Sequence, residues 1–366
     1  MTKLRLLLCF LLVHFSGASH GDVQAELDDF LEQIPSFSGI VEVRRGAEIL
    51  ASATRGYANR QTQTPWSSQS QSTVGSITKQ FTAAAVMKLV EQGRVTTQST
   101  LGEIIPDLKS SNFSGVTVHQ LLTHSAGIPD VRLPDDTPFS RDDVIAHVRE
   151  AQPMFAPGSQ YAYSNMGYSV LAAIIELSTG EAFNDYLARE LFAPAGIAVS
   201  TGYDVPIRRS DVVQAYRQDD SRVGTMIDDI YVDKQPSWLL LGNGGMYSSN
   251  DDLHRWCMAL HAGKVLKKNL VAEMWQPQID ETNGQGASFY GYGWVVFHSD
   301  ELGPIVAHNG DDAFGTLFSD FICVPVSGLT LILRSNSLDY DQNVAAVVPS
   351  LWGAVSKTLS PASTTP

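Results

Sequence analysis

The sequence has little positive charge and few cysteines. Its 366 residues include 25 lysines and arginines against 39 acidic residues, a formal net charge of −14. Nucleic-acid binding requires a concentrated basic surface, and this balance argues against it. The apolar run Leu6–Phe15 is too short to span a bilayer, so we expect no stable membrane span.

Several chemical motifs are also missing. The nine histidines form no H-E-x-x-H or H-x-H pair, so we expect no metal site. No strand-turn-helix pattern carries a G-x-S-x-G nucleophile elbow, which argues against an α/β-hydrolase. Neither a phosphate-binding glycine loop nor a dinucleotide fingerprint is present, and we expect no cofactor.

The first residues are typical of a secretory signal. Lys3 and Arg5 supply the charged start, Leu6–Phe15 the apolar run, and residues 16–19 the small side chains before a cleavage site. We therefore predict a cleaved signal peptide over residues 1–19 and a secreted or periplasmic protein.

Removal of this signal leaves two of the three cysteines. Cys257 falls in a helical pattern and Cys323 in a strand pattern, both with apolar neighbours. An exported chain could join them in a disulfide. Two separate buried thiols are the more ordinary outcome, and they are what we expect here.

The order of patterns along the chain predicts an α+β fold. Apolar and polar residues alternate on both sides of Arg45-Gly46, as in a β-hairpin, and four strand patterns follow residue 288. Between them the patterns are mostly helical. We predict one antiparallel sheet built from both chain ends and flanked by helices, with an inserted all-helical lobe.

These patterns also suggest approximate boundaries. The α/β lobe covers about residues 22–96 and 240–358, and the helical lobe about 97–239, all within one domain over residues 20–358. A helix over residues 341–359 closes the fold, and residues 359–366 form a disordered tail. A cleft between lobes is the default position for a functional site.

The stretch S-I-T-K at Ser76–Lys79 opens a long apolar helix. Residues three apart share a helix face, so the hydroxyl and the amine can meet. The field of the helix N-terminus and the apolar residues that follow both disfavour a protonated Lys79. A neutral amine can act as a general base. A capping serine with an unrelated surface lysine is the structural alternative.

Two further short motifs carry groups suited to catalysis. Tyr163-Ser164-Asn165 lies in a loop before a helix, where a phenol can move a proton and an amide can hold a lysine and a substrate carbonyl. His308-Asn309-Gly310 ends a strand pattern, where a glycine lets a substrate approach the strand edge and an exposed N–H can stabilise an oxyanion. Taken singly, each is better explained by ordinary packing or capping.

In this order, S-x-x-K, Y-S-N and H-x-G resemble the serine β-lactamase and penicillin-recognising superfamily. The similarity is greatest to its class C branch, which holds class C β-lactamases, D-Ala-D-Ala carboxypeptidases, D-aminopeptidases and related esterases. The segments "LLTHSAGIP", "FAPGSQYAYSN", "FAPAGI" and "LGNGGMYSSNDDL" also look like this family. The likeness covers about residues 41–336.

The resemblance implies a β-lactamase/transpeptidase-like fold and a role for each matching residue. Ser76 would be the nucleophile of an acyl-enzyme, and Lys79 and Tyr163 would share the base and acid duties. Asn165 would order the lysine and contact the substrate. His308, Asn309, Gly310 and Asp311 would line the substrate site, with an oxyanion hole formed by the backbone N–H groups of Ser76 and Asp311.

The chain departs from the pattern beside that oxyanion hole. His308 stands where β-lactamases of the family usually carry a lysine, and Asp311 and Asp312 follow the H-x-G motif. Either these acids repel a substrate carboxylate, which would favour neutral or amine-bearing esters and amides, or they face solvent and only their backbone matters.

We therefore expect an exported serine hydrolase acting on a small molecule or a peptide, including cell-wall peptides and esters. A true class C β-lactamase is the alternative within the family. A non-catalytic binding or regulatory module is the alternative of another class. Asn112-Phe113-Ser114 is a glycosylation acceptor only in a host that glycosylates.

Overall fold

The computed structural model describes residues 20–197, 202–203, 212–217, 219, 221–231, 235–286, 288–299, 302–312, 315–337, 353 and 355. The predicted signal segment, most of the predicted closing helix over residues 341–359 and the tail lie outside these described residues. Within the described part of the chain, no helix is long and apolar enough to cross a membrane.

One antiparallel sheet contains strands from both ends of the chain, as predicted. β1 pairs with β14 from Gly39↔Ser335 to Arg45↔Leu329, so the N-terminal hairpin lies beside the last strand. The order is β2-β1-β14-β13-β12-β11-β10-β9. The strands are β1 (Gly39–Arg45), β2 (Glu48–Arg55), β9 (Ile279–Asp280), β10 (Phe289–Tyr290), β11 (Val295–Ser299), β12 (Gly303–Asp311), β13 (Phe318–Val324) and β14 (Leu329–Ser335).

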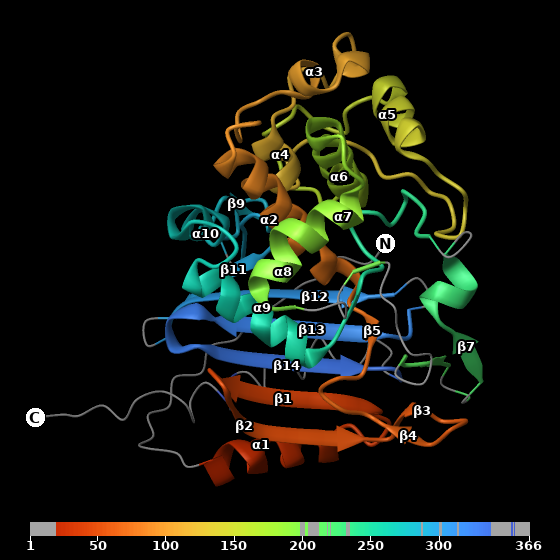
Figure 1. Ribbon diagram of the computed structural model, residues 1–366, viewed down its shortest axis with the longest axis vertical. Coiled ribbons are helices and arrows are strands. Elements are labelled where there is room, and N and C mark those ends of the chain that lie inside the picture. Colours follow the sequence, from red (N-terminus) through yellow and green to blue (C-terminus); the bar gives the residue numbers. More distant parts are fainter. Residues whose placement is uncertain are drawn as a thin grey trace, which may run out of the picture.

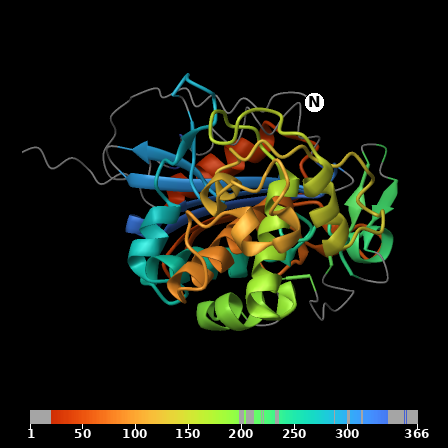
Figure 2. The same ribbon diagram turned by 90° about the horizontal axis from the view of Figure 1, so that it is seen from above.

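Helices cover both faces of this sheet (Figures 1 and 2). α1 (His20–Glu32) packs on one face, where its Leu27 and Phe30 meet alternate residues of the strands such as Val41. The opposite face carries α2 (Thr78–Glu91), α9 (Asn250–Ala262) and α10 (Lys268–Met274). The period-2 alternation of a strand gives each face its own apolar set.

The region between the two sets of sheet strands is mainly helical and rises above one end of the sheet in Figure 1. Its helices are α3 (Leu101–Ile104), α4 (Val118–Leu122), α5 (Arg141–Glu150), α6 (Asn165–Thr179), α7 (Phe183–Leu187) and α8 (Ala193–Ala195). Short strand pairs accompany them, namely β3 (Tyr57–Asn59) with β4 (Thr64–Pro65), β5 (Ser72–Thr73) with β8 (Tyr247–Ser248), and β6 (Ala215–Tyr216) with β7 (Arg222–Gly224).

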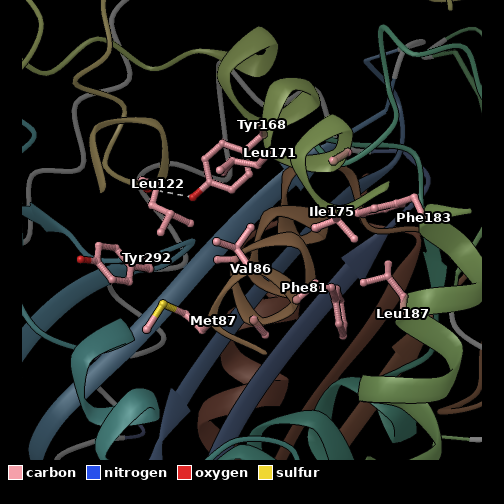
Figure 3. Close-up of a cluster of buried hydrophobic side chains, with 14 of the residues drawn as sticks. Phe81, Val86, Met87, Leu122, Tyr168, Leu171, Ile175, Phe183, Leu187 and Tyr292 are labelled. Atoms are coloured by element: carbon pink, nitrogen blue, oxygen red, sulfur yellow. Dashed lines mark hydrogen bonds between the residues drawn. The ribbon is translucent and has the colours of Figure 1, made fainter. Parts of the chain in front are cut away.

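α2 joins the sheet to the helical region. Every residue from Thr78 to Met87 is buried, so this helix is surrounded by protein on all sides. Its Phe81 and Val86 pack with Leu171 and Ile175 of α6 (Figure 3). A helix buried on all sides is held rigidly, which fixes the position of the residues at its N-terminus.

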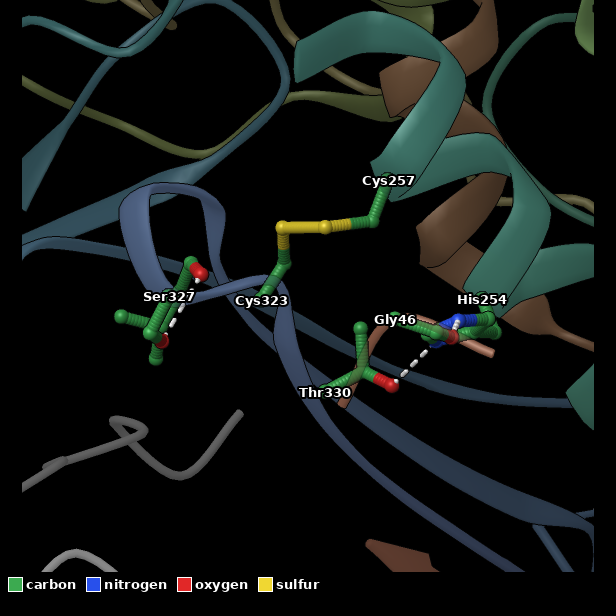
Figure 4. Close-up of a disulfide and its surroundings, with 7 residues drawn as sticks. Gly46, His254, Cys257, Cys323, Ser327 and Thr330 are labelled. Carbon is green, nitrogen blue, oxygen red and sulfur yellow. Dashed lines mark hydrogen bonds between the residues drawn. A yellow bond between two sulfur atoms is a disulfide. The ribbon is translucent and has the colours of Figure 1, made fainter. Parts of the chain in front are cut away.

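The expectation of two separate thiols is wrong. Cys257 of α9 and Cys323 of β13 form a disulfide, with their Cα atoms 6.3 Å apart (Figure 4). The two patterns were identified as helix and strand correctly, but their packing across the sheet face brings the side chains within bonding range. Nearby, His254 hydrogen-bonds to Thr330 Oγ1 and so ties α9 to β14 as well.

Candidate active site

The proposed nucleophile lies in a single helical turn, η1 (Gly75–Ile77), directly before α2. Gly75 has φ +51, a left-handed conformation that favours glycine. A Cβ there would lie 2.5 Å from the backbone N of Asp311. The turn therefore presses its backbone against the end of β12 and leaves Ser76 half-buried.

Lys79, one turn further on, is fully buried and has three hydrogen-bond acceptors around its amine. They are Ser76 Oγ at 3.1 Å, Asn165 Oδ1 at 2.8 Å and the backbone O of Asn243 at 2.7 Å. The predicted meeting of hydroxyl and amine is thus present. An unrelated surface lysine, the structural alternative, does not describe this side chain.

Burial lowers the pKa of Lys79 from 10.5 to about 7, against the opposing charges of Asp130 and Asp311. Loss of water disfavours the ammonium, and the two carboxylates are too weak to restore its usual pKa. The predicted shift toward the neutral amine is confirmed, with desolvation as its main cause. Near neutral pH a large fraction of Lys79 can accept a proton.

Tyr163 stands on the open side of this group. Its side chain is 39% exposed, and the lysine Nζ lies 4.7 Å from the centre of its ring. Its hydroxyl bonds with that of Ser76, yet desolvation raises the pKa of Tyr163 well above 10. The phenol therefore keeps its proton at neutral pH and can donate it, whereas the neutral amine of Lys79 can accept one.

Asn165 is fixed by the start of α6. Ser164 caps this helix by accepting from Gly167 N, and it donates to Asp130 Oδ1 at 2.9 Å. Asn165 then turns its Oδ1 to Lys79, and the residue remains exposed. With the oxygen assigned to the lysine, the Nδ2 amide is available to a substrate carbonyl.

His308, which stands where β-lactamases of the family usually carry a lysine, lies inside the protein. Its ring is buried, with Nδ1 2.6 Å from the backbone O of Asn309 and Nε2 3.0 Å from Tyr290 Oη. A carbonyl can only accept, so Nδ1 carries the proton and Tyr290 donates to Nε2. Burial, with a smaller effect of Lys79, lowers the pKa of His308 to about 3. The ring is neutral at physiological pH.

The far end of β12 presents backbone groups to the nucleophile. β12 pairs with β11 only as far as Ala307, so beyond this residue the β11-side edge of β12 faces the site. Asp312 N donates to Leu317 O, directly before β13, and because successive strand N–H groups point to opposite edges, the N–H of Asp311 points to the edge on the side of η1. A Cβ on Gly310 would lie 2.6 Å from Ser76 N. The backbones that carry both predicted oxyanion donors, Ser76 and Asp311, therefore lie close together.

The two aspartates after the H-x-G motif have different environments. Asp312 is buried and its Oδ1 accepts from the backbone N of Thr316 and Leu317, so its carboxylate supports the turn into β13. Asp311 is exposed, and its charge raises the pKa values of Lys79 and Asp135. Of the two readings left open, solvent exposure fails for Asp312 and holds for Asp311, although the charge of Asp311 still acts on Lys79.

Three residues of the site were not assigned roles from the sequence. Asn243 accepts from Lys79 through its backbone, Tyr290 donates to His308, and His124 accepts from the N–H of Ser164. His124 and Asn243 fall in "LLTHSAGIP" and "LGNGGMYSSNDDL", segments that already looked like the family. A contact made through a backbone oxygen, as at Asn243, does not depend on the residue type and so cannot be predicted from the sequence.

Among the described residues, no group of three or more His, Cys, Asp or Glu side chains is arranged to hold a metal ion. The site itself presents a hydroxyl, an amine, a phenol, an amide and backbone N–H groups.

Comparison with known proteins supports this picture. A profile of the family described as "Beta-lactamase" matches residues 23–350. Penicillin-binding protein 4* of Bacillus subtilis (strain 168) is 27% identical over 323 residues, which cover 84% of this chain and 70% of that protein. Esterase EstB of Burkholderia gladioli is 24% identical over 354 residues, with coverage of 86% and 90%.

A solved structure described as a class C beta-lactamase shares the architecture. It aligns with a TM-score of 0.78 at 17% identity and covers 94% of this chain and 98% of its own. The predicted fold, an antiparallel sheet from both chain ends with a helical region between them, is confirmed.

Proposed function

Because this chain belongs to the beta-lactamase family, whose members are serine hydrolases, we propose that it cleaves esters or amides through an acyl-enzyme on Ser76. The arrangement around Lys79 Nζ carries this proposal. Two of its three partners, Asn165 Oδ1 and Asn243 O, are carbonyl oxygens that can only accept. A neutral amine satisfies them with its two N–H bonds, which directs its lone pair to the third partner, Ser76 Oγ.

Acylation then follows from the positions of the groups. Lys79 takes the Ser76 proton while the serine oxygen bonds to the substrate carbonyl carbon. The backbone N–H groups of Ser76 and Asp311 stabilise the oxyanion. Tyr163 donates its proton to the leaving alcohol or amine as the old bond breaks, and the lysine ammonium replaces that proton. Water attacks the acyl-enzyme by the same route and releases the acid.

The substrate class follows from charge. Penicillins and peptides ending in D-Ala carry a carboxylate close to the scissile bond. The neutral His308 supplies no cation to pair with it, and Asp311 adds a negative charge beside the oxyanion donors. We propose that neutral esters and amides, or substrates bearing an amine, are preferred over carboxylate-bearing β-lactams.

A labelling experiment tests the activity. The purified protein is treated with a fluorophosphonate probe alongside Ser76→Ala and Ser110→Ala, the latter an exposed serine that serves as control. We expect labelling of wild type and Ser110→Ala and none of Ser76→Ala, with the same melting temperature for all three. Equal labelling of Ser76→Ala would remove the proposed nucleophile. No labelling of wild type would favour the non-catalytic binding module.

The labelled protein then distinguishes the substrate classes. Neutral p-nitrophenyl esters, amino-acid amides with a free amine and benzylpenicillin are compared by rate and by intact mass. Rapid opening of benzylpenicillin would identify a β-lactamase, and a stable penicillin adduct would identify a peptidase. Turnover of esters or amides with neither result would support the preference proposed above.

We also propose that the protein works outside the cytoplasm. The pattern of residues 1–19 supports this, and so does a disulfide, a bond that persists in oxidising compartments. Expression of the full chain in a Gram-negative host, followed by N-terminal sequencing, should give a periplasmic protein that begins near His20. A cytoplasmic protein beginning at Met1 would refute this.

A further inference from the structure

His124 stands directly behind the catalytic loop and has no part in the chemistry described above. It follows α4 with φ +55 and is 1% exposed. A left-handed backbone is uncommon outside glycine, although histidine adopts it more often than most residues, as asparagine and aspartate do. Its imidazole lies among the rings of Tyr161, Tyr163, Tyr168 and Tyr290.

Two hydrogen bonds attach the loop to this one residue. The N–H of Ala162 donates to the backbone O of His124 at 2.9 Å, and the N–H of Ser164 donates to its Nδ1 at 3.1 Å. Tyr163 lies between these two anchors. Its ring packs against the imidazole, with centroids 4.2 Å apart and planes 32° apart.

The bond from Ser164 defines the protonation state that this arrangement needs. Because Nδ1 accepts, the ring proton belongs on Nε2, and an imidazolium could not take part. Burial first, and the positive charge of Lys79 next, lower the pKa of His124 well below 6.5. The imidazole is therefore neutral, and its Nδ1 lone pair is available to the loop throughout the physiological range.

We infer that His124 is a positioning residue that holds the phenol of Tyr163 toward Ser76 by anchoring both sides of it and stacking on its ring. This inference rests on the proposed function, in which Tyr163 donates a proton to the leaving group. The 39% exposure of Tyr163 shows why such a support is needed, since one side of its ring has no protein to hold it.

The same loop offers a matched control on its outer side. Asn283 accepts from the backbone N of Tyr161 at 2.8 Å and donates to its O at 3.1 Å. Asn283→Ala removes both of these side-chain hydrogen bonds and strains a backbone with φ +52, whereas a substitution of His124 removes only the bond to Nδ1. The Asn283 variant thus loosens the loop at Tyr161, whose ring does not carry the proposed proton. A general loosening of the loop would affect both variants alike.

A double-mutant cycle tests the role. His124→Asn keeps a residue that tolerates φ +55 and removes the ring, and it is made in wild type and in Tyr163→Phe. In the wild-type background we expect His124→Asn to lower kcat about 10- to 100-fold and to change KM less than about threefold. In the Tyr163→Phe background the same substitution should lower kcat by less than about twofold. Asn283→Ala should lower kcat much less than His124→Asn does. Equal losses in both backgrounds would overturn the inference.

A second measurement does not depend on activity. In protein carrying 13C-labelled tyrosine, the Tyr163 ring resonance is assigned by its loss in Tyr163→Phe. It should shift in His124→Asn and stay in place in Asn283→Ala. If wild type hydrolyses nothing, the proposed function fails and this resonance still decides whether His124 supports Tyr163. An unmoved resonance in folded His124→Asn would refute the inference.

Discussion

The two walls of the site present different chemical groups, side chains on one and backbone groups on the other. One wall consists of η1, the start of α2 and the start of α6, and it acts through the side chains of Ser76, Lys79, Tyr163 and Asn165. The other is the end of β12, where backbone N–H and glycine face the nucleophile. In the proposed function, the first wall determines the reaction type and the side chains of the second wall select the substrate.

The two walls also differ in how they treat charge. The first wall buries an amine at the expense of folding stability, because a pKa lowered from 10.5 to about 7 corresponds to about 5 kcal/mol lost at neutral pH. The second wall holds its buried histidine neutral and exposes an aspartate. Substitutions that remove one feature at a time should separate these roles.

The largest effect is expected from Lys79→Met, which keeps the shape of the side chain and removes the base. We expect kcat/KM to fall about 1,000-fold, within the range for a general base. The melting temperature at pH 7 should not fall. Relief from burying the amine offsets the two carbonyl oxygens left without a donor, about 1 to 3 kcal/mol each. Rates and calorimetry check both parts, and activity near that of wild type would exclude Lys79 as the base.

Gly310→Ala should push the second wall away from the backbone of η1 while leaving the side chains of Ser76, Lys79, Tyr163 and Asn165 unchanged in kind. A Cβ there would lie 2.1 Å from Val74 O and 2.6 Å from Ser76 N, both backbone atoms, so the oxyanion donors must separate. Loss of one such donor costs about 100- to 1,000-fold in kcat. Gly115→Ala is the control, because its Cβ would meet nothing within 4 Å. Activity retained in folded Gly310→Ala would place the oxyanion hole elsewhere.

The first wall was more predictable from the sequence than the second. Ser76 and Lys79 are three residues apart, so helix geometry alone brings them together. Asn165 and Tyr163 could be added only through the order of motifs, because nothing local relates residue 165 to residue 79. The contact with the Asn243 backbone has no signal in residue type.

The fold was predicted well where the hydrophobic periodicity is strong, and less well where tertiary packing determines which residues meet. The hairpin β1–β2 and the helices α6 and α9 followed from their patterns. The disulfide did not, because its cysteines are 66 positions apart and the elements between them dock in a way that no pattern specifies. Likewise, Asp311 and Asp312 are neighbours in sequence, and only the strand's alternation and the following turn separate their roles.

The pH dependence of kcat/KM reports the titration of Lys79 on the first wall and the effect of Asp311 on the second wall. With a neutral ester as substrate, kcat/KM should rise about tenfold per pH unit below pH 7 and level off above it, because only the neutral amine accepts a proton. Asp311 raises the pKa of Lys79, so Asp311→Asn should move this limb to lower pH. A limb near pH 10 would mean that the lysine is not desolvated.

The smallest effect is expected on the relative rates for charged and neutral substrates, and it tests the second wall most directly. Asp311→Asn removes a charge that acts on the site, whereas Asp312→Asn alters a carboxylate that accepts from Thr316 and Leu317 in a turn. Asp311→Asn should raise the rate for carboxylate-bearing esters about three- to tenfold relative to matched neutral esters, and added salt should reduce the difference. Asp312→Asn should lower the melting temperature and leave this ratio unchanged. Equal ratios in wild type and Asp311→Asn would mean that the strand contributes its backbone alone, and substrate charge would then be read by another part of the site.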